Sequence, residues 1–240
     1  MAFAPARNSR TDFVPAQSPA LLRLCALVFL AGVAVELIAE VAHPHRESPN
    51  NHQAVFAEYA GSTDWLWVHL AQFGAGAILV AGFVVLYHAL TAGQGPGVLD
   101  RLALLSAGGT LAAIMVNMAV DGVALKHTVD AWATASPAEK MIRFAAAETV
   151  RWLEWGAHAF FEILLGLTII AFGAAMGRRR NTRWHGLLAV PAGVLVVVDG
   201  ALVGKHGFAG SPLLLIGLVL FVIVAIGLLI HPARHPATTR

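Results

Sequence analysis

Ionisable side chains recur at helical spacing inside apolar segments of this sequence. Glu36, Glu40 and His43 occupy positions i, i+4 and i+7 of the stretch VELIAEVAHPH, which places them on one face of a helix. Glu40 and His43 also form an ExxH pair, the spacing that brings a glutamate and a histidine to one metal ion in di-iron carboxylate bundles. Pro44 follows directly and disfavours a helical backbone at His43.

A second stripe of ionisable residues follows further along the chain. Glu154, His158 and Glu162 repeat at intervals of four and share a helix face. Glutamate and histidine on two such helices could bind a divalent metal ion, and buried carboxylates without a metal could act as general acids on an apolar substrate. The predicted metal ligands are Glu40, His43, Glu154 and His158.

Three similar segments predict an internal repeat. VELIAEVAHPH resembles VNMAVDGVALKH and LVVVDGALVGKH, with Glu40, Asp121 and Asp199 at equivalent positions. Fixed-period similarity records duplication in many proteins, although low complexity in Ala, Leu and Val offers a rival explanation. We therefore expect three helical hairpins, with these acids at one depth. The predicted catalytic residues are Glu36, Glu40, Asp121, Glu154, His158 and Asp199.

Other functions fit the same polar residues. Asp121 and Asp199 could form purely structural bridges between repeats with Lys126 and Lys205. A transporter or channel would use intramembrane acids and histidines to relay protons. A haem protein needs paired axial histidines, for which the predicted candidates are His69 and His158.

The composition indicates an all-α integral membrane protein. Of 240 residues, 58% are hydrophobic and 12% are charged, whereas soluble domains carry about 25% charged residues. A helix needs roughly 20 apolar residues to cross a bilayer. Tails are predicted at 1–19 and 231–240, on either side of a transmembrane domain at 20–230. The six predicted spans are 20–42, 65–90, 102–125, 150–176, 184–204 and 212–230.

The distribution of charge predicts the topology and excludes one class of partner. Arg178, Arg179 and Arg180 lie beside two spans, so the positive-inside rule predicts a plasma-membrane protein with both termini in the cytoplasm. A net charge of +2 requires no nucleic-acid partner. The single cysteine, Cys25, rules out both a disulfide framework and a Cys-rich metal site. The predicted interface anchors are Trp65, Trp67, Trp152, Trp155 and Trp184.

Together these patterns predict a multi-pass protein with an outward-facing cavity lined by carboxylates and histidines. The ligand would be a small molecule or a lipid. The sequence leaves the cofactor open, with a divalent metal as one candidate and haem as the weaker one. Ionisable groups at membrane depth are costly and are most often functional, which favours a binding or catalytic site.

Cysteine labelling tests the predicted topology. In a Cys25→Ala background, a cysteine at position 181 should be protected from a membrane-impermeant maleimide in intact cells, because the charge bias places this loop in the cytoplasm. A cysteine in the loop around His52 should be labelled. Labelling from outside at position 181 would reverse the orientation.

Overall fold

The computed structural model describes residues 18–93, 95–208 and 211–232, and this part of the chain contains helices and loops but no strand. The predicted tails lie largely outside the described residues. Six helical segments are long and apolar enough to cross a membrane, the third being the continuous run Val98–Ala133. The elements are α1 (Pro19–Ala42), α2 (His52–Ala60), α3 (Trp65–Thr91), α4 (Val98–Met118), the π-helix η1 (Ala119–Leu125), α5 (Lys126–Ala133), α6 (Lys140–Gly177), α7 (Arg183–His206) and α8 (Leu213–Ile230).

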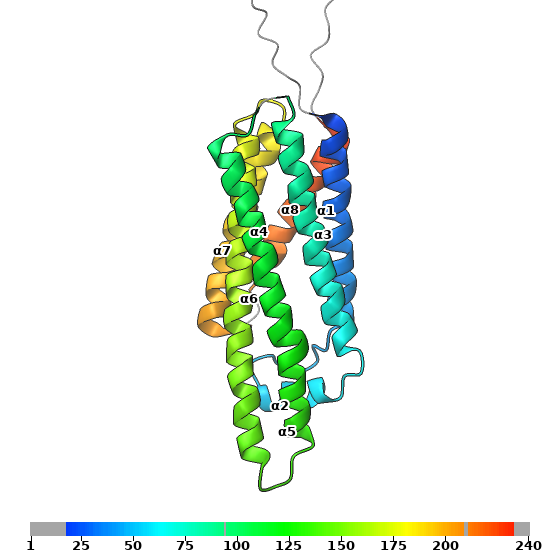
Figure 1. Cartoon of the computed structure of the whole chain (residues 1–240), viewed down its shortest axis with the longest axis vertical. Helices are drawn as coiled ribbons and strands as arrows, with labels where there is room; N and C mark the ends of the chain where they lie inside the picture. Colours follow the sequence, from blue (N-terminus) through cyan, green and yellow to red (C-terminus); the bar gives the residue numbers. More distant parts are fainter. Residues whose placement is uncertain (1–17, 94, 209–210, 233–240) are drawn as a thin grey trace, which may run out of the picture.

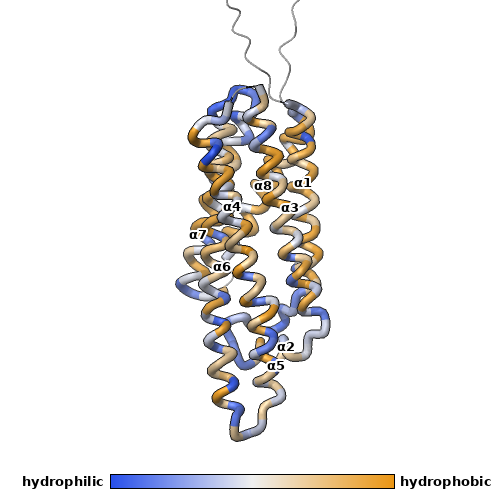
Figure 2. The backbone as a smooth tube through the Cα atoms, in the orientation of Figure 1, coloured by the Kyte–Doolittle hydropathy of each residue, from blue (hydrophilic) through white to orange (hydrophobic). Residues whose placement is uncertain are grey.

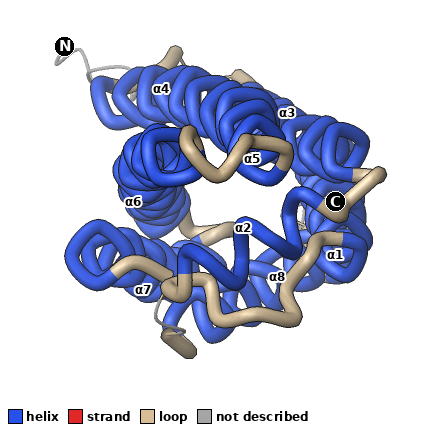
Figure 3. The backbone as a smooth tube through the Cα atoms, turned by 90° about the horizontal axis from the view of Figure 1, so that it is seen from below, coloured by secondary structure: helices blue, strands red, loops and turns tan. Residues whose placement is uncertain are grey.

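The long helices form one bundle. The start of α1 and the end of α8 lie at the same end, which is the upper end in Figure 1. Seen from the opposite end, the helices surround a central space, and the short helix α2 lies across it (Figure 3). Hydrophobic residues lie along the middle of the helices and hydrophilic residues gather at both ends (Figure 2), which is the pattern that a bilayer requires.

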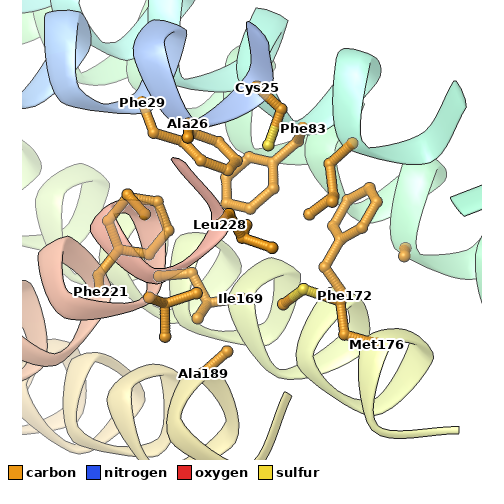
Figure 4. Close-up of a cluster of buried hydrophobic side chains, with 14 of the residues drawn as sticks. Cys25, Ala26, Phe29, Phe83, Ile169, Phe172, Met176, Ala189, Phe221 and Leu228 are labelled. Carbon is orange, nitrogen blue, oxygen red and sulfur yellow. The ribbon is translucent and has the colours of Figure 1, made fainter. Parts of the chain in front are cut away.

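The upper half of the bundle is closed by an apolar core. The rings of Phe83 and Phe172 stack at 5.1 Å, and those of Phe29 and Phe221 meet edge to face at 4.9 Å. Figure 4 shows these side chains converging from α1, α3, α6 and α8, with Cys25 among them. Beside this core, the hydroxyl groups of Ser106 and Thr110 on α4 contact that of Thr168 on α6 at 2.7 and 2.9 Å.

A second apolar cluster closes the lower end. Phe56 and Tyr59 on α2 pack with Trp65 at the start of α3 and with Trp132 on α5. Lys140 at the start of α6 donates to the Trp132 carbonyl at 2.7 Å, and its ammonium group lies over the indole ring of Trp132. The lower part of the bundle between these two clusters contains most of the buried histidines and glutamates, among them His69, Glu154 and Glu162.

One arginine of the basic loop has a structural partner. Arg179 donates to both carboxylate oxygens of Asp100 at 2.8 and 3.0 Å, and Asp100 is only 6% exposed. This ion pair ties the loop after α6 to the start of α4. The run of arginines thus contributes to packing as well as to the charge bias that predicts topology.

Helices α6 and α7 cross at very short range because glycines face each other. A Cβ atom added at Gly193 would lie 2.5 Å from the Gly166 carbonyl oxygen, and one added at Gly166 would lie 2.6 Å from the Gly193 carbonyl oxygen. In a membrane, where no hydrophobic effect drives helices together, such small residues permit the close backbone contact that holds them.

A pair of glycine substitutions tests this crossing. Gly193→Ala should lower the free energy of unfolding in detergent micelles by about 1–3 kcal/mol, because the added methyl group has no space. Gly108→Ala is the matched control, since a Cβ atom there meets nothing within 4 Å. It should be neutral or stabilise the helix by about 0.5–1 kcal/mol. Equal effects of the two substitutions would contradict the close crossing.

Candidate metal centre

Three side chains from three segments converge in the lower half of the bundle. His43, His69 and Asp121 each offer one ligand atom, and these atoms all lie within 4.8 Å of one another. The side chain of His69 is 2% exposed and that of Asp121 is 13% exposed. Imidazole nitrogens and carboxylate oxygens are ligands for zinc and other divalent transition metals.

His43 reaches this group because α1 ends just before it. The last residue of α1 is Ala42, and His43 has an extended backbone with φ −69° and ψ 138°, as expected for a residue followed by proline. Its Nδ1–H donates to the Pro44 carbonyl, 2.9 Å away, which leaves Nε2 with a free lone pair. Burial lowers the pKa of His43, although Asp121 opposes this shift. The ring is therefore neutral near pH 7 and able to bind a metal.

His69 is oriented in the same way. Its Nδ1–H donates to the carbonyl of Trp65 at 2.7 Å, and the Trp65 indole packs against its ring at 4.3 Å. A backbone carbonyl that fixes one ring nitrogen is the usual support of a metal-binding histidine. The Trp65 indole also donates from Nε1 to the Asp121 carbonyl at 3.3 Å, so one tryptophan positions both side chains.

The remaining nitrogen of His69 faces a carboxylate without a well-aligned hydrogen bond. Nε2 lies 3.1 Å from Asp121 Oδ2, yet it has no hydrogen-bond partner among the described residues. Zn–N and Zn–O bonds of about 2.0–2.1 Å at a tetrahedral angle separate two ligand atoms by about 3.4 Å. The observed distance is close to that value, so both lone pairs fit one shared ion.

Asp121 lies on the only π-helical turn of the described chain. In η1 the backbone is wider than an α-helix, and such turns occur frequently at functional sites. The next residue must be small, because a Cβ atom at Gly122 would lie 2.8 Å from the Cβ atom of His69. The Asp-Gly sequence therefore supplies the ligand and the close approach of η1 to α3.

Aromatic and ionic contacts support the centre from the lower end of the bundle. Arg151, which is 2% exposed, forms an ion pair with Glu154 and donates to the Pro49 carbonyl at 3.1 Å. Its guanidinium lies 5.7 Å from the centre of the Tyr59 ring, which in turn packs against Trp65 at 4.4 Å. Burial raises the pKa of Tyr59, so its phenol stays neutral. These contacts hold the loop between α1 and α2 over the site.

A second polar group lies deeper in the bundle. His158 Nε2 and Glu162 Oε1 are 3.1 Å apart, and Asn117 Nδ2 lies 3.5 Å from His158 Nδ1. Glu36 on α1 is close enough to interact electrostatically with both His69 and His158. Glu36 is therefore near both polar groups, which agrees with its predicted place on the inward face of α1.

The structure thus groups the predicted metal ligands differently. Of the four, His43 belongs to the converging group, while Glu154 pairs with Arg151 and His158 contacts Glu162. Glu40 is exposed. His43 lies beyond the end of α1 and therefore does not share a helix face with Glu40. The predicted haem ligands, His69 and His158, each direct Nε2 towards a different carboxylate.

The acids of the predicted repeat have unequal surroundings. Glu40 is exposed, Asp121 lies against His69, and Asp199 is buried at 5% exposure. Lys126 pairs with Asp130 at 2.6 Å, and Lys205 is exposed, so the predicted bridges do not form among the described residues. The threefold repeat stays a prediction.

Sequence reasoning missed the contribution of the buried tryptophans. Trp65 and Trp155 are 1% and 9% exposed, whereas Trp67, Trp152 and Trp184 are exposed as interface anchors would be. The spacing of Trp65 and His69, at i and i+4, was the available signal.

Comparisons with known proteins give no family. No protein-family model matches the chain, and no curated protein or solved structure matches it either. The chemistry of the site is therefore argued from its own geometry.

The buried ion pair between Arg151 and Glu154 leads to a prediction about stability. Removing one partner of a buried pair costs about 3–5 kcal/mol, because the other charge is left alone in an apolar interior. Arg151→Met should lose stability on this scale in mixed-micelle unfolding, because it strands Glu154. The double variant Arg151→Met/Glu154→Leu should recover much of the loss. A double variant less stable than Arg151→Met would show that Glu154 does not depend on Arg151.

Proposed function

We propose that this polytopic membrane protein binds a divalent transition metal, with Zn²⁺ as the first candidate, at His43, His69 and Asp121. The observation that carries the proposal is the convergence of the three ligand atoms within 4.8 Å. Two imidazoles and one carboxylate, without sulfur, match the ligand types of zinc enzymes. The single cysteine, Cys25, is in the apolar core of the upper half.

The number of ligands favours a catalytic role over a structural one. Structural zinc sites use four protein ligands, whereas catalytic sites use three and keep the fourth position for water or substrate. A zinc ion in such a site supplies a nucleophile at neutral pH by lowering the pKa of its bound water. We infer a metal-dependent enzyme that acts on a small or lipid-like ligand near the outer membrane face.

The surrounding residues suit this chemistry. The Trp65 carbonyl fixes the ring orientation of His69, and the Pro44 carbonyl does the same for His43. Glu36 is the residue we assign as proton acceptor, because it is half-buried on α1, the helix that ends directly before His43.

A proton-coupled transporter is the second candidate function. It is favoured by the deeper polar group, where the ionisable residues His158 and Glu162, with the polar Asn117, lie inward of the metal centre. The apolar core around Phe83 and Phe172 lies beyond this group. Transport would require that core to open, so the geometry supports a site more directly than a path.

Metal titration tests the proposed centre. Protein stripped with a chelator and purified in detergent should bind one Zn²⁺ or Co²⁺ per chain, and Co²⁺ should give the visible absorption of a tetrahedral site. His69→Ala and Asp121→Asn should each weaken binding by more than about 100-fold, since even outer-shell substitutions cost about 10–100-fold.

His158→Ala is the matched control for this titration, because His158 is a histidine of the same bundle outside the converging group. It should keep wild-type affinity. Absence of stoichiometric binding in the wild-type protein would overturn the proposed function, and equal losses in His158→Ala and His69→Ala would move the centre to the deeper group.

A further inference from the structure

An apolar groove opens on the outer surface of the bundle between α3 and the α4–η1 segment. Its volume is about 260 Å³. Its walls carry Leu70 and Phe73 from α3 and Met115 and Met118 from α4. Leu70 is 49% exposed and Met115 is 54% exposed, so the groove faces outward at a level where a bilayer would surround the protein.

The groove adjoins the candidate metal centre. His69 lines the groove and also belongs to the converging ligand group. Gly122, which lines the groove as well, directly follows the ligand Asp121. The groove and the candidate metal centre therefore share one side chain, His69, and one backbone segment.

The depth of the groove fits the polar boundary of the outer leaflet. His69 is four residues from Trp65, where α3 begins, so it lies about 6 Å below the helix start. The groove continues from His69 to Phe73 and Met115, which are one or more turns deeper. A lipid chain in the groove would run towards the membrane centre and leave its polar end beside His69.

The walls of the groove suit a flexible hydrocarbon chain. The small residues Ala119 and Gly122 and the flexible Met118 form walls that a hydrocarbon chain can follow.

We propose that this groove binds the acyl chain of a glycerophospholipid and places its ester region at His69, beside the candidate metal centre. This inference rests on the proposed function and names its substrate class as a membrane lipid that enters sideways from the bilayer. A glycerophospholipid is the occupant because it has an ester group at the base of a long chain, at the depth where His69 lies.

Photo-crosslinking tests the lipid site. The full-length protein is placed in nanodiscs of phosphatidylcholine with a trace of phosphatidylcholine that carries a diazirine in one acyl chain. Mass spectrometry should find the label concentrated on Met115 and Met118 relative to other lipid-facing positions. Ala119→Trp should reduce labelling there by at least about tenfold, which corresponds to about 1.4 kcal/mol of binding free energy.

Ala112→Trp is the matched control, because Ala112 is exposed on α4 but does not line the groove. It should leave the labelling pattern of the wild-type protein unchanged. Uniform labelling around the bundle would overturn the proposal.

A measurement of metal binding distinguishes failure of the proposed lipid site from failure of the proposed metal centre. Ala119 is not a ligand, so Ala119→Trp should bind Co²⁺ with wild-type affinity while it loses the lipid label. If the wild-type protein binds no metal but is labelled selectively in the groove, the metal function fails and the lipid site stands. If it binds metal but is labelled uniformly, the lipid site fails and the metal function stands.

Discussion

The cost of placing polar groups inside an apolar bundle determines how the lower half of this protein is built. Each buried ionisable side chain needs a partner, because an unpaired charge at membrane depth is unfavourable by several kcal/mol. His69 meets this requirement through the Trp65 carbonyl, and Arg151 through Glu154 and the Pro49 carbonyl. The first two pairings lie within one helix each, whereas the Arg151–Pro49 hydrogen bond joins α6 to the loop after α1 and so fixes the relative positions of these two elements.

The apolar clusters above and below complete this arrangement. Phenylalanines of α1, α3, α6 and α8 fill the upper half, and α2 with α5 covers the lower end. The polar side chains between them are thereby kept from both aqueous phases, which strengthens their mutual electrostatic interactions. The same exclusion of water would make a bound metal ion more effective as a Lewis acid. The two apolar clusters, the polar region between them and the candidate site therefore all follow from which side chains are buried.

The sequence predicted the helical, membrane-spanning character of the fold because long apolar runs have few alternatives. It also named His43, His69 and Asp121 as candidates, each in a different role. It could not group them. Periodicity places residues on one helix face, but His43 lies after the end of α1 and Asp121 lies on a π-turn. Both positions depart from the regular geometry that periodicity assumes, and the pairing of Glu154 with its neighbour Arg151 depends on burial.

The π-turn has a further consequence for how this chain tolerates change in length. An α-helix advances about 100° per residue, and η1 holds more residues per turn than the helices on either side. Removal of one residue within Ala119–Leu125 would let the segment relax into a regular helix at little backbone cost. The residues of the turn itself, Asp121 among them, would then take new directions, whereas Trp132 beyond the turn would keep its face and its place in the cluster beneath α2. A single deletion that is harmless for helix formation would therefore displace a liganding residue and leave the cluster at the lower end intact.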